Sequence, residues 1–205
     1  MLDPKQNNHI ESDSIYLEES LTSYQSPLES NYVTTDNCIV ENANNAYEGN
    51  TYLDISIVGL GYVGSVSCAC FSSLGHQVIG VDPDVSKVNA ISNGFSPIVE
   101  PQLGELLSEA HTNSMLNATT NIEPAILASN ITLVSVGTPS KSDGGCDLTY
   151  LKAATTEIGN ALAKKDSYHV IVFRSTVPPT TTTKILIPLL EKSSGKMCGR
   201  DFGVC

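Results

Sequence analysis

The sequence has few basic residues. Among its 205 residues, 11 Lys and Arg stand against 22 Asp and Glu, which gives a formal net charge of -11. Nine acidic residues and one basic residue lie in the first 50 positions, so the rest of the chain is only weakly acidic. Without a cluster of Lys and Arg, the chain would repel the phosphates of nucleic acids and anionic lipid surfaces rather than neutralise them. We therefore expect neither nucleic acid nor a membrane among its partners.

The chain also lacks long apolar runs and paired-cysteine motifs. Nothing in the first 30 residues has the basic start and the apolar run of about 7 to 15 residues that a secretory signal needs. No segment approaches the length of a membrane span. The six cysteines are scattered, with no C-x-x-C pair and no histidines at metal-ligand spacing. We therefore expect free thiols, a reducing cytoplasmic location and no metal site.

Residues 1–52 differ in composition from the rest of the chain. They are rich in Asn, Ser, Glu and Tyr, and their apolar residues are isolated and follow neither the helical nor the strand period. This composition predicts a disordered acidic extension. The extension is either an interaction or regulatory arm or an unselected addition to the chain.

From residue 53 onwards, buried-strand patterns alternate with helical ones. Short runs rich in β-branched residues predict strands, and longer runs with few charges predict helices between them. The expected strands are 55–58, 77–81, 131–136 and 169–173, and the expected helices are 62–74, 148–165 and 181–192, the last with a kink at Pro188. Alternation of this kind is typical of an α/β, Rossmann-type parallel sheet with helices on both faces. Residues 201–205 resemble the start of one more strand, so we expect residues 53–205 to form a domain truncated at its C-terminal end.

The first strand leads into a glycine-rich turn. Residues 59–64 read G-L-G-Y-V-G, which fits the pattern G-x-G-x-x-G between a strand and a helix. In that context Gly59 permits the sharp turn and Gly61 lets the backbone approach a pyrophosphate, while Gly64 allows the helix to pack closely on the sheet. The free amides and the positive end of the helix dipole would then face the phosphates of a ligand.

An acidic residue ends the second strand. Asp82 follows Gly59 by 23 residues, where a carboxylate can accept hydrogen bonds from both hydroxyls of an adenosine ribose. It would repel a 2′-phosphate, so the pattern favours NAD over NADP. Lys87 could reach the same ribose or remain a solvated charge. An S-adenosylmethionine site and a structural unit without ligand are the alternatives for the whole arrangement, and the third glycine favours a dinucleotide.

A threonine follows each of two further strands. Thr138 follows the strand 131–136 and Thr176 follows the strand 169–173, and ligands of open α/β sheets lie beyond these carboxyl ends. A threonine there can also be only a turn or capping residue.

These segments together resemble the amino-terminal domain of the UDP-glucose/GDP-mannose dehydrogenase family. The resemblance covers residues 53–205 and is carried by the segments 55–64, 80–82, 96–101, 136–140 and 174–177, with 187–189, 194–196 and 201–204 favouring the GDP-mannose branch. It implies NAD-dependent oxidation of the C6 alcohol of a nucleotide sugar to a carboxylate by two hydride transfers. GDP-mannose, in synthesis of an alginate-type polysaccharide, is the expected substrate, and UDP-glucose is the alternative.

The resemblance also implies roles for single residues. The cofactor contacts would be Tyr62 and Val63 in the turn, Asp82 and Lys87 at the ribose, and Thr138 and Thr176 beside the pyrophosphate and nicotinamide. The family's catalytic cysteine, lysine and asparagine match no position here, and we assign no catalytic role to Cys146 or Cys198. By itself the chain is therefore expected to be inactive and not to form the family's homo-oligomer reliably. A non-catalytic NAD-binding or regulatory module and a marginally stable product remain as alternatives.

Overall fold

A computed structural model describes residues 52–205 except residue 143. The prediction of a disordered extension falls on residues outside the described part. Among the described residues, no helix is long and apolar enough to cross a membrane.

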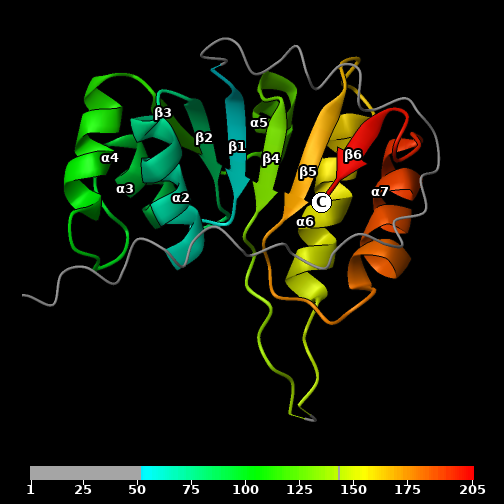
Figure 1. The fold of residues 1–205 in the computed structure, drawn as a ribbon. Coiled ribbons are helices and arrows are strands. Elements are labelled where there is room, and N and C mark those ends of the chain that lie inside the picture. The colour runs from blue at the N-terminus through cyan, green and yellow to red at the C-terminus, as the bar shows by residue number, and fades with distance from the viewer. Residues whose placement is uncertain (1–51, 143) are drawn as a thin grey trace, which may run out of the picture. The chain divides into compact units, whose positions relative to one another are not determined.

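Six parallel strands form one sheet in the order β3-β2-β1-β4-β5-β6 (Figure 1). The strands are β1 (Asp54–Val58), β2 (Gln77–Val81), β3 (Leu116–Thr119), β4 (Ile131–Val134), β5 (His169–Phe173) and β6 (Phe202–Val204). This is the predicted Rossmann-type sheet, and the final segment is a strand as expected. The sequence prediction did not include β3, and it placed the end of β4 two residues too late.

Helices cover both faces of this sheet (Figure 1). They are α2 (Tyr62–Ser73), α3 (Val85–Ser92), α4 (Leu103–Thr112), α5 (Ile122–Ala128), α6 (Thr149–Leu162) and α7 (Ile187–Ser194). The predicted helix 181–192 is two pieces: a wide π-helical segment, η1 (Thr182–Leu186), precedes α7, and Pro188 lies in the first turn of α7. Proline fits there because the first helical amides have no partner within the helix.

Alternating side chains of the strands build two separate cores. In β1, Ile55 and Ile57 pack with residues of α2, α3 and α4, whereas Val58 packs with residues of α5, α6 and α7. Apolar side chains are needed on both faces of the strands, because a parallel sheet with helices on each face has no solvent-facing side. The carboxyl ends of the strands then meet at one edge of the sheet, where ligands of such folds bind.

A buried polar cluster crosses the sheet at the opposite, amino end of the strands. The imidazole of His169 contacts the Thr132 hydroxyl through Nε2 (2.6 Å) and the Ser129 carbonyl through Nδ1 (3.1 Å). The carbonyl can only accept, so Nδ1 carries the proton and Nε2 accepts from Thr132. Nearby, the Lys165 ammonium donates to the carbonyls of Ile126, Leu127 and Ser129. Burial first, and then the Lys165 charge, lower the pKa of His169 to about 4.

This shift makes the free energy of unfolding dependent on pH. The pKa of His169 is about 6.5 in the unfolded chain and about 4 in the folded one, so the unfolded state binds more protons between these values. Stability is therefore expected to fall by about 3 kcal/mol as the pH drops through this window. Denaturant unfolding at pH 7 and pH 4.5 measures the change. In a His169→Gln variant the drop is expected to be clearly smaller, and an equal drop would contradict the assignment.

Candidate cofactor-binding site

The turn after β1 is built around Gly59. Its φ is +100°, a conformation that favours glycine, and its amide donates to the Val81 carbonyl at 2.7 Å. A Cβ at Gly59 would lie 2.7 Å from the Ser135 carbonyl oxygen. The turn is thus fixed against both neighbouring strands, β2 and β4.

The other two glycines of the motif have different surroundings. A Cβ added to Gly64 would overlap the carbonyl oxygen of Gly59, so only glycine lets α2 approach the turn this closely. A Cβ added to Gly61 would meet no protein atom within 4 Å. Glycine at position 61 therefore leaves open space beside the backbone rather than relieving a clash, as close approach of a pyrophosphate requires.

The helix α2 presents its N-terminus at this open space. It begins at Tyr62, and its first turn contains no acidic residue and no side-chain cap. The amides of Tyr62 and Val63 are in the first helical turn, where amides have no partner within the helix, and the positive end of the dipole is not neutralised. The Tyr62 side chain is exposed, and its hydrogen bond with Glu100 raises the pKa of its hydroxyl.

Asp82 follows β2 and is nearly buried. Its Oδ2 accepts from the Leu60 amide at 2.7 Å, and its Oδ1 accepts from the Asp84 amide at 2.9 Å. The Lys87 ammonium lies 3.3 Å from Oδ2 and 3.5 Å from Oδ1. A carboxylate has about four acceptor positions, and these contacts occupy all of them. The two contacts with Lys87 are the longest, so a ligand hydroxyl would bind by taking the place of the ammonium. The contact with Leu60 also ties the carboxylate to the glycine-rich turn.

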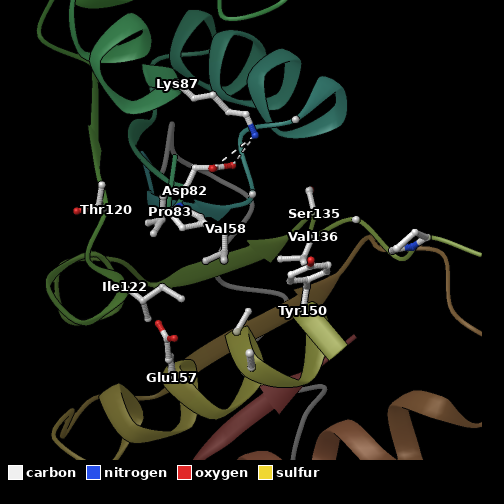
Figure 2. Close-up of a pocket in the computed structure, with 17 residues that line it drawn as sticks. Val58, Asp82, Pro83, Lys87, Thr120, Ile122, Ser135, Val136, Tyr150 and Glu157 are labelled. Atoms are coloured by element: carbon white, nitrogen blue, oxygen red, sulfur yellow. Dashed lines mark hydrogen bonds and ion pairs between the residues drawn. The ribbon is translucent and has the colours of Figure 1, made fainter. Parts of the chain in front are cut away.

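These residues border a pocket of about 530 Å³ at the carboxyl edge of the sheet (Figure 2). The glycine-rich turn, the end of β2 and the end of β4 form one side, and residues 150–157 of α6 form the other. The lining residues that the sequence prediction did not single out are Val58, Val81, Pro83, Thr120, Ile122, Ser135, Val136, Gly137, Pro139, Tyr150, Ala153, Ala154 and Glu157. Most of them are apolar or small, as in pockets that bury a flat organic ligand.

One hydroxyl in the pocket lining is unsatisfied. Among the described residues, the Oγ of Ser135 is buried and has no hydrogen-bond partner. Ser135 directly follows β4 and lines the pocket beside Gly59. Buried hydroxyls normally have partners, so this one fits a ligand with polar groups. Together with the space at Gly61 and the Asp82 carboxylate in the pocket lining, it fits a dinucleotide such as NAD.

The two predicted threonines meet each other outside the pocket lining. The Thr138 hydroxyl donates to the Thr176 carbonyl at 2.8 Å, which joins the segments after β4 and β5. The thiol of Cys146 lies 3.9 Å from the Thr138 carbonyl and 4.0 Å from that of Thr176. The segments after the two strands therefore lie side by side, and the Thr138 hydroxyl already has a protein partner.

The predicted site residues thus lie in four places. Gly59, Gly61, Asp82 and Lys87 line the pocket. Gly64 supports the turn from behind, and Tyr62 and Val63 lie at the N-terminus of α2. Their contacts with a cofactor stay predictions, as do those of the two threonines.

The parallel sheet, the glycine-rich turn and the acidic residue after β2 define a dinucleotide-binding domain. A family model for the NAD binding domain of the UDP-glucose/GDP-mannose dehydrogenase family matches residues 53–205. The chain belongs to this family of oxidoreductases, and its cofactor is NAD. The match begins at the residue where the composition changes.

Individual relatives support the assignment. GDP-mannose 6-dehydrogenase of Azotobacter vinelandii is 49% identical over 150 residues, 73% of this chain and 34% of that protein. UDP-glucose 6-dehydrogenase of Haloferax volcanii is 43% identical over 152 residues, 74% of this chain and 35% of that protein. A ternary complex of GDP-mannose dehydrogenase from Pseudomonas aeruginosa has a TM-score of 0.73 at 47% identity, covering 74% of this chain and 35% of that one. The chain therefore spans about a third of the length of the curated relatives that it matches.

Proposed function

We propose that this chain is the NAD-binding part of a nucleotide-sugar 6-dehydrogenase. The free amides at the start of α2 and the space at Gly61 receive the pyrophosphate, and Asp82 with Lys87 holds the adenosine ribose. The observation that carries the proposal is the position of the Asp82 carboxylate, which is bonded to the Leu60 amide inside the turn and lines the same pocket as Gly61. A carboxylate there accepts ribose hydroxyls and repels a 2′-phosphate.

The proposed reaction is oxidation of GDP-mannose to GDP-mannuronate for synthesis of an alginate-type polysaccharide. Support comes from the GDP-mannose dehydrogenases, which are 48 to 49% identical to the chain, against 43% for the UDP-glucose enzyme of Haloferax volcanii. When bound, NAD supplies the acceptor for a hydride, and conversion of an alcohol to a carboxylate needs two such transfers. This chain's residues bind and orient the cofactor, and the groups that act on the sugar are proposed to lie in a part of the enzyme outside it.

A chimera tests whether the domain serves a dehydrogenase. Residues 53–205 would replace the matching domain of the Pseudomonas aeruginosa GDP-mannose dehydrogenase, and NADH formation with GDP-mannose would be followed at 340 nm. We expect activity within about 10-fold of the parent enzyme, because a factor of ten corresponds to only about 1.4 kcal/mol of lost transition-state stabilisation. A folded chimera that binds NAD and forms no NADH would instead favour a non-catalytic NAD-binding module.

A matched chimera addresses the substrate. The same residues would replace the corresponding domain of the Haloferax volcanii UDP-glucose enzyme, and turnover would be expressed relative to that parent. A domain that evolved beside a GDP-mannose site has surfaces that fit the Pseudomonas aeruginosa enzyme better. The chimera with that enzyme is therefore expected to keep the larger fraction of its parent's activity. The reverse order would favour UDP-glucose.

A further inference from the structure

The wall of the pocket opposite the glycine-rich turn carries a carboxylate without a protein partner. Glu157 of α6 lines the pocket, and within the described part of the chain no hydrogen bond or ion pair engages it. Figure 2 shows its carboxylate directed from the helix toward Ile122. The surroundings are otherwise small or apolar, with Ala153 and Ala154 on the same helix. The side chain is exposed to solvent, so a donor on a ligand in the pocket would replace water as its partner.

The geometry of the pocket decides which part of a dinucleotide reaches this wall. The pyrophosphate belongs at Gly61 and the N-terminus of α2, and the ribose belongs at Asp82. The base is attached to the ribose on the side away from the phosphates, so it must occupy the remaining wall. That wall consists of Pro83, Thr120, Ile122 and the residues of α6. Its apolar side chains can cover the faces of a purine ring.

The chemistry of the adenine edge matches the carboxylate. The 6-amino group of adenine is a donor, and an ionised carboxylate only accepts. The hydroxyls of Thr120 and Tyr150 also line the pocket and can accept, but a hydrogen bond to an ionised carboxylate is the stronger one. Lys87, the cation that lines the pocket, is held 3.3 Å from Asp82 and is directed to that carboxylate rather than to Glu157 (Figure 2).

We propose that Glu157 is a specificity-determining residue that accepts a hydrogen bond from the 6-amino group of the adenine ring and so selects adenine dinucleotides. The inference rests on the proposed placement of NAD in this pocket. Because Glu157 is exposed to solvent, water competes for the carboxylate, and the expected preference is moderate.

Comparing two proteins with two ligands isolates the contact between Glu157 and the 6-amino group. The 205-residue chain and its Glu157→Leu variant would be titrated with NAD and with the analogue that has hydrogen in place of the 6-amino group, nicotinamide purine dinucleotide. The wild-type chain is expected to bind NAD about 10-fold more tightly than the analogue, and the variant is expected to bind the two within 2-fold. Glu157→Gln keeps an acceptor oxygen and is expected to restore part of the preference.

Controls separate the contact from effects on folding and from the proposed function. Glu109→Leu changes a carboxylate on α4, outside the pocket lining, and is expected to keep the full preference for NAD. Circular dichroism establishes that each variant is folded. If the wild-type chain and Glu157→Leu prefer NAD equally, this inference fails while the NAD site stands. If the folded wild-type chain does not bind NAD, both fail.

Discussion

Replacing Asp82 by Ala is expected to lower the affinity of the chain for NAD about 100-fold. The change removes an ionised acceptor for two ribose hydroxyls, and hydrogen bonds to charged groups contribute about 1.5 kcal/mol or more each. The carboxylate also accepts from the Leu60 amide, so the variant loses part of the order of the turn as well. Isothermal titration calorimetry of the two proteins measures the difference.

A conservative change separates the charge of Asp82 from its structural contact. Asp82→Asn keeps one oxygen that can accept from the Leu60 amide but removes the charge that repels a 2′-phosphate. The ratio of NADP to NAD affinity is therefore expected to rise at least about 10-fold. The matched control is Asp84→Asn, because Asp84 caps α3 through the Ser86 amide and does not line the pocket. If Asp84→Asn changed cofactor preference as much as Asp82→Asn, the assigned role of Asp82 would be wrong.

Gly64→Ala is expected to lower the free energy of unfolding by about 3 kcal/mol and to abolish measurable NAD binding. The new methyl group would overlap the carbonyl oxygen of Gly59, a backbone atom that cannot move aside without displacing the turn. Forced overpacking of this kind costs about 1 to 3 kcal/mol, and we expect the upper value because the methyl group overlaps a backbone atom. Denaturant unfolding and calorimetry measure the two effects.

Gly61→Ala provides the contrast within the same motif. The added Cβ meets no protein atom within 4 Å, and the φ of Gly61 is -77°, so stability is expected to change by less than about 0.5 kcal/mol. The methyl group occupies the space proposed for the pyrophosphate, so NAD affinity is still expected to fall by at least about 10-fold. Loss of binding without loss of stability would distinguish a cofactor contact from a structural glycine. Unchanged binding would contradict the placement of the pyrophosphate.

The sequence was sufficient to predict five of the six strands but not the edge strand β3. The strands β1, β2, β4 and β5 are short apolar or β-branched runs because both of their faces are covered. The strand β3 has the sequence L-N-A-T and is the edge strand next to β2, so only one of its side chains is fully buried. Without a buried pattern, its four residues carry no signal in the sequence.

The same limit applies to the site. The glycine-rich turn and Asp82 were predictable because their spacing is local to one strand-helix-strand unit. Tyr150 and Glu157 come from α6, more than 60 residues later, and reach the pocket only because the crossover places that helix against β4 and β5. No local pattern distinguishes Glu157 from a solvated helix residue. Its position depends on tertiary packing.

The binding of NAD by this pocket can be measured by calorimetric titration of the 205-residue chain with NAD and with NADP. We expect saturable binding of one NAD per chain and at least about 10-fold weaker binding of NADP, because Asp82 repels the 2′-phosphate. Circular dichroism of the same sample would establish that the chain is folded. A folded chain that binds neither dinucleotide, or that prefers NADP, would contradict the assignment of this pocket.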